Sequence, residues 1–308
     1  MSKYTTEALR TLALVGHGAA GKTSLAEAML HATGAIQAKG SVDKGNTVCD
    51  HDPQEKEAGH SLNSSLFSLD TGATRIHAVD TPGYPDFAGP ALAALAGVDT
   101  ALIVINAQTG VELMTERMMR YAAERKLCRM IVINKIDADN LDLPGLVADI
   151  RARFGKACMI LDLPTHGGAE VVEVLDTANG EADFESIAAA HRALIDQIVE
   201  EDEDLLAQYL EYGADPSPAA LHAPFEKALR EGHLIPILFT SAKTGAGIPQ
   251  LLHVLATLAP NPAEGNPPAF YKGEPGGKSE PFQADPDPAK HVLAHVFKVV
   301  ADPYMGKI

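Results

Sequence analysis

One eight-residue segment near the amino terminus, Gly16–Thr23, constrains the fold more than any other part of the sequence. It reads Gly-His-Gly-Ala-Ala-Gly-Lys-Thr, fits the pattern G-x-x-x-x-G-K-S/T, and lies between an apolar run at 12–15 and a helical pattern at 22–32. In such a loop, glycines let backbone N–H groups turn toward phosphate oxygens, and the helix that follows adds positive partial charge. Lys22 would place its charge at the β and γ phosphates, and Thr23 would offer a hydroxyl to Mg²⁺. The segment therefore predicts a strand–loop–helix unit that binds a nucleoside triphosphate.

Apolar runs and helical patterns alternate along most of the chain. The continuous apolar run at 101–105 is typical of a central parallel strand, which is buried on both faces. This alternation predicts an α/β fold, a doubly wound and mostly parallel sheet of the P-loop NTPase type, with ligands at the carboxyl ends of its strands. Strands are expected at 12–15, 64–69, 75–79, 101–105, 130–133, 234–239 and 291–300, a β-like segment at 159–175, and helices at 22–32, 112–125, 146–154, 184–210 and 248–258.

Changes in sequence texture predict how the chain is divided. The sheet pattern stops near residue 156 and resumes at 233, so the part between is expected to be an α+β subdomain inserted into the sheet domain. A stretch rich in Pro, Gly and Glu follows, which is typical of a linker. The predicted divisions are 1–155 with 233–262 for the nucleotide-binding domain, 156–232 for the insertion, 263–290 for the linker, and 291–308 for the start of a truncated β domain.

Charge and composition narrow the expected partners and location. The 308 residues include 41 Asp and Glu against 25 Lys and Arg, a net charge of −16, so direct DNA binding is not expected because phosphates repel such a chain. No apolar run approaches the roughly 18–20 residues that cross a bilayer, and residues 1–10 contain no apolar signal segment. The three cysteines, Cys49, Cys128 and Cys158, form no CxxC pair. We therefore expect a cytoplasmic monomer that does not contact membranes.

The tetrapeptide Asp80-Thr81-Pro82-Gly83 follows the strand expected at 75–79. A carboxylate at this strand end, beside the phosphate loop, can hold Mg²⁺ through water, and the Gly83 N–H can meet a γ phosphate. The same residue types also form plain turns, so it is their position downstream of the phosphate loop that points to a nucleotide site.

Two motifs at the ends of later strands predict the base. Segment 134–137, Asn-Lys-Ile-Asp, follows the strand at 130–133, and Asp137 can accept hydrogen bonds from guanine N1–H and the 2-amino group, a donor pair that adenine lacks. Segment 241–243, Ser-Ala-Lys, follows the strand at 234–239, and its backbone can meet guanine O6. Together the motifs predict a site for GTP or GDP with Mg²⁺, formed by Gly16, His17, Gly18, Ala19, Ala20, Gly21, Lys22, Thr23, Ser24, Asp80, Thr81, Pro82, Gly83, Asn134, Lys135, Asp137, Ser241, Ala242 and Lys243.

The order and spacing of these motifs resemble those of a translational GTPase, in particular elongation factor G and its G-like paralogues. Residues 34–62 resemble the first switch of that family and residues 80–87 its second switch. Residues 156–232 match its inserted subdomain, and 296–304 resemble the opening strand of its second domain. The resemblance implies a Mg²⁺-dependent GTPase that changes conformation on the ribosome, its partner, which the family contacts through later domains.

Three places depart from the pattern of that family. Ala19 stands where the family has an Asp that helps to recruit a monovalent cation. Residues 58–61 read Ala-Gly-His-Ser where the family has Arg-Gly-Ile-Thr, so the switch lacks one cation but keeps a hydroxyl. Tyr84 stands where the family has the His that orients the attacking water, and a phenol, with a pKa of about 10, cannot carry positive charge. Hydrolysis is therefore expected to be slow without the ribosome.

The expected roles follow from the motifs and the resemblance together. Asp137 argues against an ATP-dependent kinase or motor, the third function considered. The other two are GTP hydrolysis and a GTP-gated binding or regulatory module with negligible hydrolysis. Translocation, ribosome recycling, ribosomal protection and regulation all use such a front end. The residues expected to be catalytic are Lys22, Gly83 and Tyr84, and those expected to hold the metal are Thr23, Ser61 and Asp80.

Two further features are given simpler interpretations. The acidic run at 200–204 is expected to be a solvated face of the helix at 184–210, with a docking surface for a basic partner such as the ribosome as the alternative. Among the twelve histidines, His291 and His295 show H-x₃-H spacing, but in a strand this step spans roughly 13 Å. Structural or solvated roles are therefore expected for the histidines.

Overall fold

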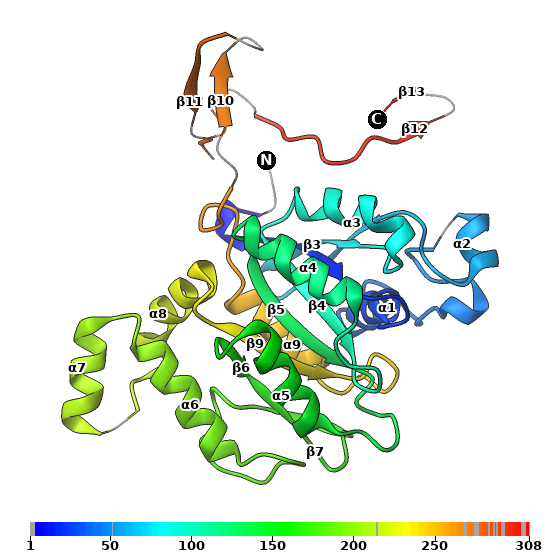
Figure 1. The fold of residues 1–308 in the computed structure, drawn as a ribbon. Coiled ribbons are helices and arrows are strands. Elements are labelled where there is room, and N and C mark those ends of the chain that lie inside the picture. Colours follow the sequence, from blue (N-terminus) through cyan, green and yellow to red (C-terminus); the bar gives the residue numbers. More distant parts are fainter. Residues whose placement is uncertain are drawn as a thin grey trace.

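Seven strands form the central sheet of the computed structural model (Figure 1). Neighbouring strands run parallel except for one antiparallel hairpin formed by the first two at one edge. This arrangement confirms the predicted mostly parallel α/β sheet. The strand order across the sheet is β2 (Ser65–Thr71), β3 (Thr74–Asp80), β1 (Leu9–Val15), β4 (Thr100–Asn106), β5 (Cys128–Asn134), β9 (Ile235–Thr240) and β6 (Cys158–Ile160). The structure describes residues 4–50, 52–213, 215–267, 270–273, 277–282, 284–285, 287, 289–290, 293–302 and 306–307.

Helices pack against both faces of this sheet. α1 (Lys22–Ala32) packs beside α9 (Ile248–Thr257), and both contact β3. α3 (Ala88–Leu95) packs beside α4 (Leu113–Glu124), and they contact β1 and β4 respectively. α5 (Leu143–Phe154) follows β5 along the chain. Because both faces are covered, β4 and β9 are buried along their whole length, as the apolar runs in the sequence predict.

Two connecting segments approach the amino end of α1. The first contains the short helices η2 (Val42–Lys44) and α2 (Pro53–Ala58), and the second contains η3 (Pro85–Phe87). A further short helix, η1 (Thr6–Ala8), precedes β1. The two segments belong to the ranges that resemble the switches of translational GTPases.

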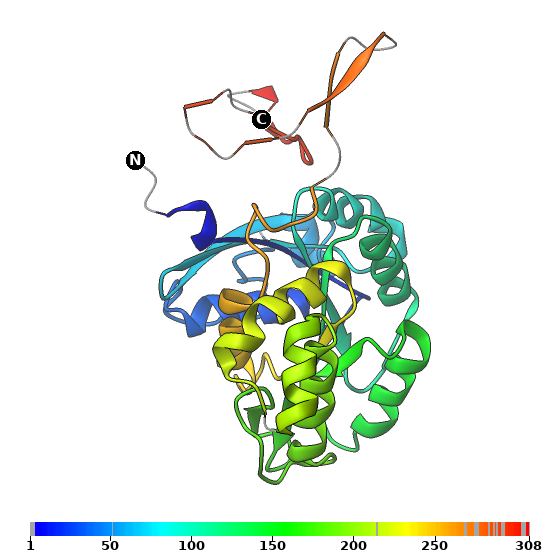
Figure 2. The same cartoon turned by 90° about the vertical axis from the view of Figure 1, so that its left-hand side faces the viewer.

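The range predicted as an insertion contains three helices and a hairpin. β7 (Asp162–Thr165) and β8 (Glu170–Glu173) pair antiparallel, while α6 (Ile187–Val199), α7 (Glu203–Tyr212) and α8 (Pro218–Glu231) gather near the β6 edge of the sheet (Figures 1 and 2). No helix was predicted from the sequence where α8 lies. β6 lies inside the predicted range yet pairs with β9 of the central sheet, and the division of the chain into domains stays a prediction.

The prediction of one helix over 184–210 is wrong, because the chain turns between α6 and α7. Asp202 begins α7 as its N-cap and accepts a hydrogen bond from Leu205 N at 2.9 Å. Glu201 turns inward, with a side chain only 8% exposed, and lies 2.7 Å from His233 Nδ1 and 3.6 Å from Lys227 Nζ. The acidic run at 200–204 is therefore not one solvated helix face: one of its carboxylates caps a helix and another is held by cationic or hydrogen-bonding partners.

The last part of the chain differs from its predicted form in two places. A hairpin of β10 (Phe270–Gly273) and β11 (Ser279–Phe282) lies within the range expected to be a linker. Leu293–Val300 forms no strand, contrary to the prediction for 291–300, because no strand of the described residues lies beside it to pair with its backbone. His291 lies outside the described residues. The chain continues into β12 (Ala301–Asp302), which pairs with β13 (Gly306–Lys307).

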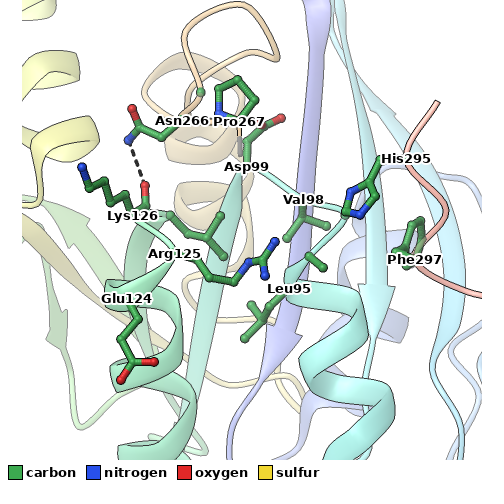
Figure 3. A pocket seen from close by; sticks show the side chains of 14 residues that line it. Leu95, Val98, Asp99, Glu124, Arg125, Lys126, Asn266, Pro267, His295 and Phe297 are labelled. Atoms are coloured by element: carbon green, nitrogen blue, oxygen red, sulfur yellow. Dashed lines mark hydrogen bonds between the residues drawn. The ribbon is translucent and has the colours of Figure 1, made fainter. Parts of the chain in front are cut away.

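Side chains of this last part contact the sheet domain, and Lys298 Nζ donates to Ser64 O. The Phe297 ring contacts Gly97, and with His295 it lines a cavity of about 750 Å³ (Figure 3). The cavity lies near Asp99 and Leu127, just before β4 and β5 begin, and therefore at the end of the sheet opposite to the carboxyl ends of the strands. In the described part of the chain, no helix is both long and apolar enough to cross a membrane.

The N-cap of α7 generates the first testable prediction. Replacing Asp202 by Ala removes the acceptor of the Leu205 N–H, so we expect α7 to lose about 1 kcal/mol of stability. Faster amide hydrogen exchange in residues 203–212 measures this loss. The control Asp204→Ala removes a charge of the first turn but no cap, and equal exchange in the two variants would contradict the assignment of the cap.

Candidate nucleotide-binding site

The phosphate loop lies between β1 and α1, at the carboxyl ends of the strands. Gly16 has a φ of +140°, and a Cβ there would collide with the Val104 carbonyl oxygen. Gly21, the N-cap of α1, has a φ of +90°, and a Cβ there would lie 2.5 Å from Asn134 Nδ2. Both positions therefore require glycine for two reasons, the backbone conformation and the close approach of a neighbour.

Lys22 holds its charge inside this loop. Its ammonium donates to the carbonyls of Gly16 at 3.2 Å and His17 at 2.8 Å, and the residue is 6% exposed. Burial lowers the pKa of Lys22 to about 8, while the nearby Asp80 and Glu112 act in the opposite direction. A cation held by neutral carbonyls in a buried loop is poised to bind phosphate oxygens.

The predicted metal-binding side chains lie together. Asp80 Oδ2 accepts a hydrogen bond from Thr23 Oγ1 at 2.7 Å, and Ser61 Oγ lies 3.3 Å from the same hydroxyl. Asp80 Oδ1 is buried with no hydrogen-bond partner among the described residues. Burial raises the pKa of Asp80 to about 6, although the Thr23 hydrogen bond and the charge of Lys22 lower it. Two hydroxyls and a carboxylate with a free oxygen are the hard oxygen donors that suit Mg²⁺.

Ser61 is attached to its own segment through a second carboxylate. Its Oγ donates to Asp50 Oδ1 at 3.1 Å, and Thr47 Oγ1 donates to Asp50 Oδ2 at 2.9 Å. Asp50 is 3% exposed. This chain of hydrogen bonds connects the segment before β2 to the first turn of α1 at Thr23.

Tyr84 lies over the phosphate loop between two imidazoles. A Cβ at Gly18 would lie 2.8 Å from the Tyr84 ring, which shows how closely the ring covers the loop. The His60 ring meets the Tyr84 ring edge-on at 4.6 Å between centroids, and the His17 ring lies at 6.4 Å. Gly83 packs against Lys22 Nζ and the backbone of the loop. Neither of these histidine side chains has a functional role predicted from the sequence.

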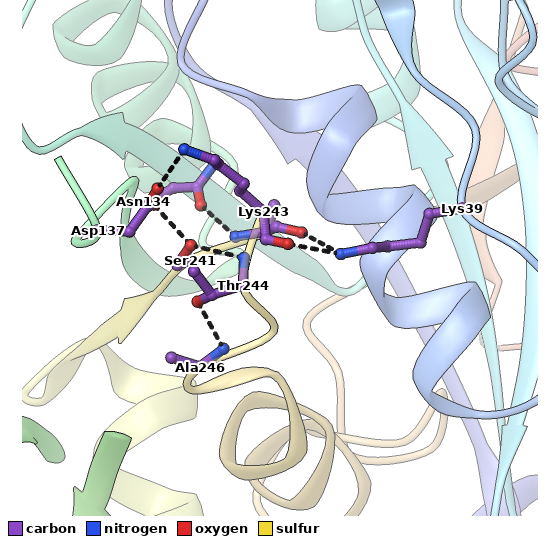
Figure 4. Close-up of polar contacts among 8 residues, drawn as sticks. Lys39, Asn134, Asp137, Ser241, Lys243, Thr244 and Ala246 are labelled. Carbon is purple, nitrogen blue, oxygen red and sulfur yellow. Dashed lines mark hydrogen bonds and ion pairs between the residues drawn. The ribbon is translucent and has the colours of Figure 1, made fainter. Parts of the chain in front are cut away.

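The predicted base-binding residues form a second group at the ends of β5 and β9. Asp137 Oδ1 accepts a hydrogen bond from Ser241 Oγ at 2.6 Å, and Asp137 Oδ2 lies 3.5 Å from Lys243 Nζ (Figure 4). Partial burial raises the pKa of Asp137, but the Ser241 hydrogen bond, a backbone hydrogen bond and Lys243 outweigh it, so the pKa lies below its usual value. Asp137 is thus held as a carboxylate, the form that accepts hydrogen bonds.

Asn134 joins the two groups. Its Nδ2 donates to Ala20 O at 3.1 Å, and its Oδ1 accepts from Ala242 N at 3.1 Å. Lys135 makes a second connection, because its Nζ donates to Ala19 O at 2.8 Å. The phosphate loop and the base-binding loops are thereby held at a fixed separation.

Two adjoining clefts contain most of the predicted residues. The base side, of about 810 Å³, is lined by Asp137 and Lys243, and the phosphate side, of about 320 Å³, by Lys22 and Gly83; Ser24 and Lys135 line both. The predicted residues that line neither cleft are Gly16, His17, Ala20, Asp80, Pro82 and Ser241. The base-side cleft is also lined by residues that belong to none of the nucleotide-binding motifs and were not predicted individually: Glu27, Lys39, Ser41 and Gln108.

Comparisons with known proteins agree with this geometry. Residues 7–261 match the family described as elongation factor Tu GTP binding domain. The chain is 33% identical to an elongation factor G-like protein of Mycobacterium tuberculosis, covering 97% of this chain and 43% of that protein. It is 30% identical to elongation factor G of Thermotoga maritima, covering 97% and 46%. A crystal structure of a Thermus thermophilus protein matches with a TM-score of 0.80 and 32% identity, covering 98% of this chain and 44% of that one. The chain therefore spans less than half the length of these relatives.

The buried carboxylate of Asp80 generates the second prediction. Its pKa in the folded protein, about 6, lies above the ordinary value of 3.8, so the folded state binds the extra proton between these values and loses stability as the pH rises through them. Asp80→Asn removes this cost, and we expect the free energy of unfolding without ligands to rise by about 1–3 kcal/mol at pH 7.5. Urea denaturation at pH 4.5 and 7.5 measures the change.

The same variant is expected to bind Mg²⁺ and nucleotide less tightly, because an amide is a poorer ligand than a carboxylate. Asp86→Asn is the control, since Asp86 is exposed and lies in the next turn of the same segment. A free energy of unfolding for Asp80→Asn that matches that of Asp86→Asn at both pH values would contradict the burial cost assigned to Asp80.

Proposed function

Since the chain belongs to the family of elongation factor Tu GTP-binding domains, we propose that it binds GTP and GDP with Mg²⁺ and hydrolyses GTP. In this proposal it is the nucleotide-binding part of an elongation factor G-like translational GTPase. The single observation that carries the proposal is Asp137, a carboxylate held by Ser241 and Lys243 in a cleft that continues into the phosphate loop.

Base selection follows from the chemistry of that carboxylate. Guanine presents N1–H and a 2-amino group on one edge, and both can donate to Asp137. Adenine lacks this pair of donors and would leave the carboxylate without partners, at a large cost in affinity. In the loop at 241–243, Ser241 N donates to Ala246 O and Ala242 N donates to Asn134 Oδ1. Lys243 lines the cleft, and in this proposal its N–H donates to guanine O6.

The phosphate end provides positioning and charge neutralisation, which phosphoryl transfer to water requires. Lys22 would move its hydrogen bonds from loop carbonyls to phosphate oxygens, and the Gly83 N–H would donate to the γ phosphate. Thr23 and Ser61 would bind Mg²⁺ directly and Asp80 through water, and the bound ion would neutralise charge on the β and γ phosphates. Binding of the γ phosphate would separate Gly83 from Lys22, so the segment at 80–87 would respond to the nucleotide.

Hydrolysis is proposed to be slow without the ribosome. Tyr84 covers the phosphate loop, and its phenol can donate or accept a hydrogen bond but cannot carry positive charge. A GTP-gated binding or regulatory module with negligible hydrolysis is the second candidate. Tyr84 favours it, as do Ala19 and Ala58, because each lacks the ionisable side chain that the resemblance to elongation factor G implies at that position.

The cellular setting belongs to the same proposal. The relatives named elongation factor G suggest the ribosome as the partner, and the cytoplasm as the location. With a net charge of −16, this chain would reach ribosomal RNA through other parts of the full protein or through a local surface. A monomer that binds neither DNA nor membranes completes the proposal, with the divisions 1–155 with 233–262, 156–232, 263–290 and 291–308.

Base specificity is tested by Asp137→Asn. The amide would donate where the carboxylate accepts, so we expect GDP affinity to fall about a hundredfold and xanthosine diphosphate, which has a carbonyl at C2, to bind better than GDP. Calorimetry with GDP, xanthosine diphosphate and ADP measures the change. The control is Asp139→Asn, which changes an exposed carboxylate two residues away. Unchanged GDP affinity in Asp137→Asn would overturn the assignment, as would a wild-type protein that binds ADP as well as GDP.

Hydrolysis is tested by Tyr84→His. An imidazole can exchange a proton near neutral pH, so we expect single-turnover release of the γ phosphate to rise about tenfold or more. The measurement is made with and without ribosomes, and Tyr84→Phe serves as the control that keeps the ring. If wild type shows negligible rates in both conditions and Tyr84→His does not raise them, the binding module replaces the GTPase as the function.

A further inference from the structure

Lys39 makes a contact that no motif predicts. Its Nζ donates to the carbonyl oxygens of Ala242 and Lys243, each at 2.9 Å (Figure 4). These two consecutive carbonyls belong to the base-binding loop, far away along the chain. Lys39 itself lies in the segment at 34–62 that resembles a first switch. One ammonium therefore connects this segment directly to the loop that is proposed to recognise guanine.

The backbone next to Lys39 is held in place. Gly40 N donates to Glu27 Oε2 at 2.7 Å, and Val48 N donates to Glu27 Oε1 at 2.5 Å. Glu27 lies on α1 and is 2% exposed. A Cβ at Gly40 would lie 2.5 Å from Asn46 O, so the chain at 40 and 46 is packed too closely for any other residue. Lys39 thus extends from a fixed base, which lowers the entropy cost of its two hydrogen bonds.

The same segment lines both ends of the nucleotide cleft. Lys39 and Gly40 line the base side together with Asp137, whereas Val42 and Asp43 line the phosphate side together with Lys22. Ser41 lies between them and lines both. The short stretch from 39 to 43 therefore connects the base-binding loop to the wall of the phosphate cleft.

We propose that Lys39 is a positioning residue that ties the first-switch segment to the base-binding loop, so that binding of the base further restrains residues 39–48. The tether itself needs no nucleotide, whereas its coupling to the base rests on the proposed function. Because it acts through the 241–243 loop, Lys39 contributes to how long the nucleotide stays bound without touching the phosphates.

Hydrogen exchange tests the tether in the protein without nucleotide. Lys39→Met keeps most of the apolar stem but removes three donors, so we expect amide exchange in 40–48 and in 241–246 to become about three- to tenfold faster. Lys39→Arg, which keeps donors, should restore part of the protection. Lys44→Met is the matched control, because Lys44 is an exposed lysine of the same segment. Equal exchange in the Lys39→Met and Lys44→Met variants would overturn the proposal.

Nucleotide release tests the coupling. We expect a fluorescent GDP analogue to dissociate about three- to tenfold faster from Lys39→Met than from wild type, and GDP to slow exchange in 40–48 only where Lys39 or Arg is present. In a Ser241→Ala background, the effect of Lys39→Met should shrink below about twofold, because both changes act on one loop. A full effect in that background would refute action through the loop. If wild type binds no GDP at all, the proposed function fails, while the exchange experiment still decides whether the tether exists.

Discussion

The site depends on two hydrogen bonds of the Asn134 side chain. It is 1% exposed and uses its donor on Ala20 O and its acceptor on Ala242 N, at 3.1 Å each. A buried amide that loses either partner carries the full cost of desolvation, so the two loops can separate only at a considerable penalty. This one residue at the end of β5 therefore sets the distance between the phosphate end of the cleft and the base end.

Burial of opposite charges prepares the phosphate end. Burial lowers the pKa of Lys22 to about 8 and raises that of Asp80 to about 6, because each charged form has lost its water. Each group would regain a partner from a ligand of opposite charge, phosphate for Lys22 and a divalent cation for Asp80. The burial of these charges lowers the stability of the free protein, and a bound ligand of opposite charge would offset that cost. Such perturbed titratable groups are common in functional clefts.

Contacts across the cleft join the two switch-like segments to the same centre. Ser61 reaches Thr23 from one segment, Tyr84 covers Gly18 from the other, and the His60 and Tyr84 rings meet between them at 4.6 Å. Lys39 adds a connection at the base side. Movement of either segment would therefore alter the environment of the phosphates.

The sequence by itself determined the local units: the phosphate loop with its required glycines at 16 and 21, and the buried parallel strands. It also led to the proposal that Asp137 selects the base. These features depend on residue type and on short spacings along the chain, both of which are given by the sequence. Tertiary structure decided what depends on partners far away in sequence. The helix expected at 184–210 is interrupted at Glu201 and Asp202. The Asp202 side chain caps α7, and the Glu201 carboxylate contacts His233. The contact of Lys39 could not be predicted from the sequence, because a lysine in a polar loop belongs to no periodic pattern. Only folding brings its ammonium to two carbonyls of a distant loop.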